Sequence, residues 1–146
     1  MQTISCLEAL SPSLAEAYRQ ANDNQRRRAA LAMCVLAVEQ AGLQSGEAEA
    51  ALAILRRGVP EPSDMQQKLD RLAAEFDERY FELSDNTENI TPEALVMFQK
   101  ARAAEALALA LSPNGEQLDG AIYEAIAAWS DRDEAMRAAE TLLRAK

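Results

Sequence analysis

Apolar residues recur every three or four positions through most of this chain, which is the spacing of amphipathic helices. The clearest stripe covers five turns and consists of Met65, Leu69, Leu72, Phe76, Tyr80 and Leu83. A capping box formed by Ser63 and Gln66 precedes this stripe, and a polar loop over Ser84–Asn89 follows it. The pattern predicts one long helix that packs through a single face.

Start and stop signals define three helices before this one. Ser11 followed by Pro12 predicts a helix start, because proline has no N–H to lose at the first helical position. The first predicted helix is Pro12–Ala21; Asn22–Asn24 then break and recap the chain for a second helix that ends at Ala41, before Gly42. Ser45 caps a third helix, which ends at Gly58 and the following proline-containing segment.

The signals after the long helix are similar. Thr91 and Pro92 predict a fifth helix that runs to Leu111. Beyond it, one apolar register is formed by Leu118, Ile122, Ile126 and Trp129. Because Ser130 and Asp133 resemble a new cap, this last segment is either two short helices or one bent helix.

Two segments are apolar enough to lie at the centre of the fold. Ala29–Val38 in the second helix is apolar on every side, so we expect it to be covered all round. In the fifth helix, Arg102 and Glu105 are the only charges from Ala101 onward, and their spacing allows them to pair. We therefore predict an all-α fold, a single domain over 1–146, built as a bundle of about six mostly antiparallel helices.

A stack of helix pairs is an alternative architecture. Tyr123, Ala125, Trp129 and Ala135 follow a pattern that resembles tetratricopeptide-type repeats. No 34-residue period recurs earlier in the chain, and such a stack needs about three units to bury a core. On the basis of this pattern, a helical-repeat scaffold remains an alternative function.

Composition narrows the chemistry. The 146 residues include 30 alanines and no histidine, so the commonest general base and metal ligand is missing. The formal charge of −9 disfavours nucleic acid and anionic membranes and favours a basic protein as partner. Cys6 and Cys34 fit no zinc or redox spacing, so we expect reduced thiols, with Cys34 in the core. The longest apolar run is too short to span a membrane, so we expect a cytoplasmic protein. We also expect no cofactor.

The strongest functional signal is an acidic stretch between Asp70 and Glu93. It contains eight acidic residues and two arginines, a local charge of −6. Glu75, Glu78 and Glu82 are three and four residues apart, so they share one face of the long helix. The predicted partner-binding surface consists of Glu75, Glu78, Glu82, Asp85 and Glu88. A solvated helix face with no partner is the alternative interpretation.

A metal site is a second interpretation of the same acids. The pairs Glu75 with Glu78 and Glu116 with Asp119 resemble the helical carboxylate motifs of all-α nucleotide pyrophosphohydrolases. That resemblance implies Mg²⁺ held against a triphosphate by these four residues. However, Ala74 stands where that family has a further glutamate, and no basic phosphate contacts follow. Apart from this alternative, we predict no metal ligand and no catalytic residue.

Arg26–Arg28 place positive charge in the first turns of the second helix, where it opposes the helix dipole. One interpretation is exposure to solvent with Asp23 as a neighbour. The other is docking against the acidic loop Asp85–Glu88, within one molecule or between two molecules of a dimer. The sequence leaves the oligomeric state open.

The apolar helices also carry a family resemblance. Arg28–Ala32, Ala37–Glu39 with Gly42–Leu43, and Phe98–Leu107 are similar to segments of small helical proteins encoded beside bacterial polymorphic toxins. The resemblance implies an immunity protein, which binds and neutralises its cognate toxin without catalysis. It carries no site residue over to this chain. It agrees with the acidic surface, since such a surface is suited to a basic toxin.

Overall fold

The computed structural model describes residues 6–57, 64–84, 91–112 and 117–145. These residues form eight α-helices and no strand. The helices are α1 (Cys6–Leu10), α2 (Pro12–Gln20), α3 (Asp23–Ala41), α4 (Gly46–Arg56), α5 (Met65–Ser84), α6 (Pro92–Ala110), α7 (Leu118–Ala127) and α8 (Arg132–Arg144). The predicted all-α class is confirmed, whereas the predicted count of about six is too low. The short α1 was not predicted, and the last segment is two helices.

Side-chain caps begin α2, α3, α4 and α6 where the sequence predicted them. The hydroxyl oxygen of Ser11 accepts a hydrogen bond from the Leu14 N–H at 3.3 Å, and Thr91 does the same for Ala94 at 3.1 Å. Asn22 and Gln25 form a reciprocal capping box at the start of α3. These bonds satisfy N–H groups that have no partner inside the helix.

Two predicted caps have different outcomes. Asp131, and not Ser130, caps α8, because its Oδ1 accepts from the N–H of Glu134 at 3.1 Å. Ser130 lies one residue earlier and its hydroxyl instead accepts from the amide of Gln99 at 3.1 Å. The predicted capping box of α5 includes Ser63, which lies outside the described residues.

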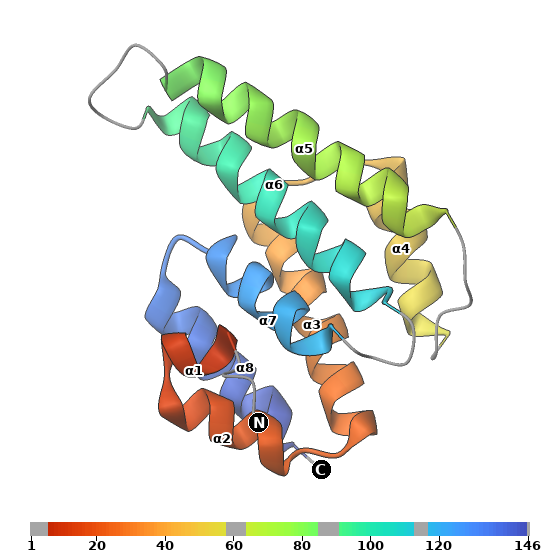
Figure 1. The fold of residues 1–146 in the computed structure, drawn as a ribbon, viewed down its shortest axis with the longest axis vertical. Coiled ribbons are helices and arrows are strands. Elements are labelled where there is room, and N and C mark those ends of the chain that lie inside the picture. The colour runs from red at the N-terminus through yellow and green to blue at the C-terminus, as the bar shows by residue number, and fades with distance from the viewer. Residues whose placement is uncertain (1–5, 58–63, 85–90, 113–116, 146) are drawn as a thin grey trace, which may run out of the picture.

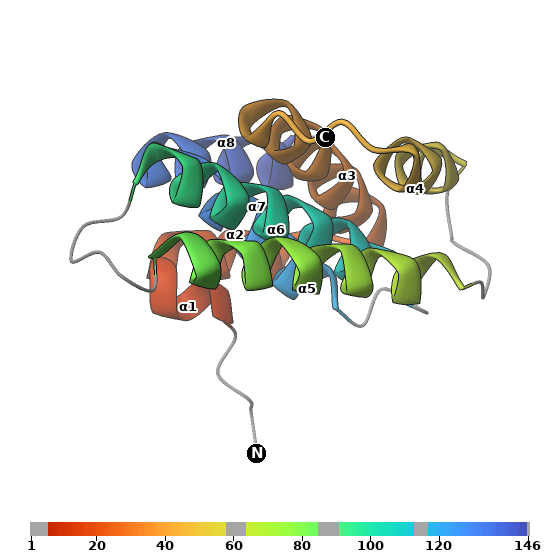
Figure 2. The same ribbon diagram turned by 90° about the horizontal axis from the view of Figure 1, so that it is seen from above.

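The helices form a compact bundle in which α5 and α6 make a long antiparallel hairpin (Figures 1 and 2). The helix α6 packs against α5, α7, α3 and α4. The helix α3 packs against α6, α7, α8 and α4, and α1 and α2 lie against α7 and α8. Because α3 contacts helices from the far end of the chain, the arrangement is a bundle and not an open stack of sequential pairs.

Alanine dominates the core and allows the helix axes to approach closely. In α6 the fully buried side chains include Ala101, Ala103, Ala104, Ala106, Leu107 and Ala108. Larger apolar side chains fill the spaces between the helices, and Leu7, Met33 and Ile122 have no exposed surface. Leu7 explains why the five-residue α1 forms, since burying one leucine contributes about 2 kcal/mol. The prediction that α6 is central is confirmed.

The helix α3 is not covered all round, contrary to expectation. Ala29, Met33 and Cys34 are buried, but Leu31 and Val35 are only half-buried. The cause is that α4 packs beside α3 without covering its whole outer face, which leaves an apolar groove. No helix of the described residues is long and apolar enough to cross a membrane.

Candidate functional site

The acidic face predicted on α5 is exposed. Glu75, Glu78 and Glu82 are all exposed, in a helix whose predicted extent is confirmed apart from Ser84, its last residue. Asp85 and Glu88, the two other residues predicted for this surface, lie outside the described residues. The three described glutamates lie beside one another on one face of α5, because positions three and four residues apart are neighbours on a helix.

Among the described residues, one ion pair involves a glutamate of this face. Nη1 of Arg79 lies 3.4 Å from Oε2 of Glu82, and both side chains are about 60% exposed. An ion pair this exposed is screened by water and contributes little to stability. The face therefore keeps a negative potential, which suits a basic surface more than an acidic one.

The loop end of the α5–α6 hairpin also exposes apolar side chains that the sequence stripe did not mark. Phe81 is 66% exposed, Leu95 43% and Val96 37%. No other large apolar side chain of the described residues is exposed to this degree. Phe81 follows Glu78 by three residues and precedes Glu82 directly, so it borders the acidic face. We call the described residues 78–84 and 92–96 the hairpin end.

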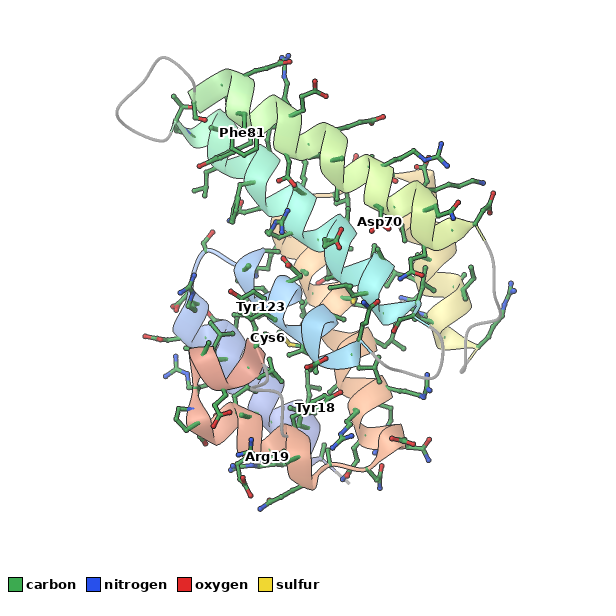
Figure 3. The ribbon with its side chains drawn as sticks, viewed as in Figure 1. Cys6, Tyr18, Arg19, Asp70, Phe81 and Tyr123 are labelled. Carbon is green, nitrogen blue, oxygen red and sulfur yellow. The ribbon has the colours of Figure 1, made fainter. Side chains whose placement is uncertain are left out.

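The aromatic side chains of the hairpin support one another. The Tyr80 ring lies 5.5 Å from Phe81 and 5.7 Å from Phe98, measured between centroids. Contacts of this kind favour tilted or edge-on rings. Figure 3 shows Phe81 at the loop end of the hairpin and Asp70 towards the opposite end of α5. The hairpin carries four of the seven aromatic residues of the chain, which is a signal that the sequence does contain.

A second polar group of side chains connects α5, α6 and α7. The guanidinium of Arg102 lies 2.8 Å from Asp77 and 2.9 Å from Glu124. The predicted pairing of Arg102 with Glu105 is therefore replaced by pairs to two neighbouring helices, and Glu105 instead hydrogen-bonds to Asp70. Nε of Arg102 is buried and has no hydrogen-bond partner among the described residues.

The environment of Glu105 changes its protonation. Partial burial, followed by the negative charge of Asp70 and the hydrogen bond to it, raises the pKa of Glu105 to about 7. Glu124 adds to this effect and Arg102 opposes it. A carboxyl that holds its proton near neutral pH can donate to a carboxylate, so Glu105 and Asp70 join α6 to α5.

The structure describes three of the four carboxylates of the metal interpretation. Glu75 and Glu78 are exposed on α5, and Glu116 lies outside the described residues. Asp119 lies in the first turn of α7, where its backbone hydrogen-bonds to the Tyr18 hydroxyl of α2. Among the described residues, no three acidic or cysteine side chains are placed to hold a metal ion.

The three arginines at the start of α3 have different surroundings. Arg26 donates to the backbone carbonyls of Tyr18 at 2.9 Å and Arg19 at 3.2 Å, and it lies over the Tyr18 ring at 4.4 Å. It therefore satisfies the C-terminal end of α2, where positive charge is favourable. Arg27 and Arg28 point to neither of these partners and line the groove beside α3. The loop Asp85–Glu88, their predicted docking site, lies outside the described residues.

Both cysteines are free thiols, as predicted. Cys34 is fully buried, and burial raises its pKa to about 12. Burial and the charge of Asp119 also raise the pKa of the half-buried Cys6. Neither thiol is therefore activated as a nucleophile or ligand at neutral pH.

Comparisons with known proteins add no assignment to this geometry. No family model, no curated protein and no solved structure matches the chain.

Proposed function

We propose that this chain is a non-enzymatic protein-binding module that acts in the cytoplasm and binds a basic protein through the hairpin end. The observation that carries the proposal is the exposed Phe81 beside Glu78 and Glu82. Interfaces combine aromatic anchors at their centre with charged residues that direct association. The proposed contact includes Glu75 and also extends to Leu95 on α6.

The most specific form of this proposal is an immunity protein that neutralises a basic bacterial toxin. A helical hairpin that presents an aromatic side chain and several carboxylates is suited to cover a basic catalytic cleft. The net charge of −9 would increase the rate of encounter with such a cleft. The resemblance of the apolar segments to immunity proteins supports the same form.

The test uses the product of the gene adjoining this one in its source genome, purified as a catalytically inactive variant. Association with the chain is measured by biolayer interferometry at about 50 and about 200 mM salt, where surface charges are screened to different degrees. The variant Glu78→Lys/Glu82→Lys should associate about tenfold more slowly at the lower salt. Phe81→Ser should mainly increase the dissociation rate.

A matched control keeps the charge change and moves its position. Glu49→Lys/Asp133→Lys reverses two exposed acids on α4 and α8. This control should slow association far less than reversal at the hairpin end. If the two double variants slowed association equally, the net charge of the chain and not the position of the acidic face would determine the rate. Unchanged rates in all variants would contradict the assigned surface. In cells, coexpression of the chain should restore growth in the presence of the active toxin.

A further inference from the structure

The groove beside α3 is a partly apolar surface that the described residues leave open. Its narrow part has a volume of about 410 Å³ and is lined by Arg28, Leu31, Ala32, Val35, Leu36 and Arg56. A wider part of about 850 Å³ adjoins it and is more polar, because it adds Asn22, Asn24, Gln25 and Arg27 to the lining together with Leu55. The lining residues of α3 lie three and four positions apart, so they form one stripe of that helix. We call this surface the α3–α4 groove.

The rim of the α3–α4 groove is basic, although the chain as a whole is strongly acidic. Arg28 and Arg56 border both parts of the groove, and Arg27 borders the wider part. None of these three arginines forms an ion pair with a carboxylate of the described residues. The start of α3 adds the positive end of its helix dipole on the same side. A ligand for this groove is therefore apolar at its centre and negatively charged at its edges.

The chain itself carries a surface with these properties. The hairpin end contains every large apolar side chain of the described residues that is exposed, namely Phe81, Leu95 and Val96. Exposed acids accompany them on both helices, Glu78 and Glu82 on α5 and Glu93 on α6. The hairpin end and the α3–α4 groove thus match in apolar character and are opposite in charge.

We propose that two copies of this chain bind head to tail, with the hairpin end of one copy in the α3–α4 groove of the next. Phe81 fills the apolar part of the groove beside Leu31 and Val35. The arginines at the rim meet the glutamates of the hairpin end. Such a contact covers the stripe of α3 that the fold leaves open, in a helix whose apolar residues need cover on all sides.

The position of the two surfaces determines the kind of assembly. The loop end of the hairpin and the first half of α3 lie at opposite ends of the molecule (Figure 1). Each copy therefore offers one hairpin end and one groove, and the contact is heterologous. It extends into a chain or closes into a ring, according to the rotation between copies. The inference rests on the proposed function, because both treat the hairpin end as a binding surface. A basic partner would compete with a second copy of the chain for this surface.

Sedimentation velocity of the purified full chain tests the proposal. We expect the weight-average mass to rise with concentration between about 5 and about 500 µM, as for a micromolar contact. The rise should be smaller at about 500 mM salt than at about 20 mM, because salt screens the pairs at the rim. A monomer at every concentration in low salt would overturn the proposal.

Two variants locate the contact. Phe81→Ser blocks the hairpin end, and Arg28→Glu/Arg56→Glu blocks the groove; each should be a monomer with unchanged helical circular dichroism. Mixed together, they should form a 1:1 dimer and nothing larger, because one intact hairpin end and one intact groove remain. The control Arg132→Glu/Arg137→Glu makes the same charge change at exposed sites on α8 and should still self-associate. Self-association that persists in both blocked variants, or a mixture that stays monomeric, would contradict head-to-tail binding.

The two proposals fail separately. Loss of self-association in Arg28→Glu/Arg56→Glu should leave binding to the basic partner intact, because the hairpin end is unchanged. A chain that self-associates but binds no basic protein through Phe81 would contradict the proposed function alone. A chain that binds such a protein but stays monomeric would contradict the self-association alone.

Discussion

Arg102 on α6 and Asp77 on α5 form a short ion pair, with 2.8 Å between Nη2 and Oδ2. The other terminal nitrogen of the same guanidinium lies 2.9 Å from Glu124 on α7. The Arg102 side chain is only 20% exposed, so water screens these pairs less than it screens a surface pair. One cation therefore fixes the position of three helices, including the hairpin that carries Phe81.

Removal of Arg102 should destabilise the fold. Arg102→Ala leaves the carboxylates of Asp77 and Glu124 close together without their cation, which should lower the free energy of unfolding by about 2–3 kcal/mol. Arg79→Ala removes an exposed pair from the same hairpin and should cost less than about 0.5 kcal/mol. Urea unfolding followed by circular dichroism measures both. A similar loss in the two variants would show that the partial burial of Arg102 has no energetic consequence.

Glu105 should make stability depend on pH. Its pKa is raised to about 7 in the folded chain from an ordinary value of 4.5, so the folded state binds the proton more tightly. The stabilisation is fully present below pH 4.5 and is lost as the pH rises towards and through 7. Because the group is only partly buried, we expect its contribution to change by about 1 kcal/mol over this window.

The variant Glu105→Gln isolates this contribution from the other acids. Its amide is neutral at every pH and can donate to Asp70 in place of the protonated carboxyl. The difference in urea midpoint between variant and wild type should therefore be small at pH 5 and favour the variant at pH 8. A difference that does not change between these pH values would rule out titration of Glu105 in this window.

Local signals were sufficient to predict most helix boundaries, because caps depend on residues within a few positions. The Asn22–Gln25 capping box and Gly42 at the end of α3 are examples. The helix α1 could not be predicted in this way. Five residues are too short to show a period, and α1 is stabilised by burying Leu7 against distant helices.

The partners of side chains were harder to predict than helices. Glu105 lies three residues from Arg102, but carboxylates from two other helices reach the guanidinium instead. The sequence contains all these charges and does not contain their three-dimensional proximity. For the candidate site, the acidic face was predictable from spacing, whereas the exposure of Phe81 depends on where the bundle ends.

Gly42 should tolerate alanine poorly for a backbone reason alone. It ends α3 with φ at +66°, a conformation that side chains disfavour, although a Cβ there would meet no atom within 4 Å. Gly42→Ala should therefore lower the free energy of unfolding by about 1 kcal/mol. Gly46, the first residue of α4, has equally open surroundings without a positive φ, so Gly46→Ala should be neutral or slightly stabilising. Thermal unfolding of both variants tests this, and equal effects would contradict a conformational cause.

The two thiols should report on how firmly the centre of the bundle is closed. Cys34 is fully buried with a pKa of about 12, so at pH 8 it is protonated and shielded from reagents, whereas Cys6 is only half-buried. In the variant Cys6→Ser, the remaining thiol can react with a disulfide reagent only when the fold opens. For a domain with a typical free energy of unfolding, the reaction should be at least ~10³-fold slower in buffer than in concentrated urea.

The reaction is followed by absorbance, and Cys34→Ser is the matched variant, in which the half-buried Cys6 should react faster in buffer than Cys34 does. If Cys34 reacted in buffer at a rate close to that in urea, α3 would open to solvent in the folded chain, and a firmly packed centre made of small side chains would be contradicted.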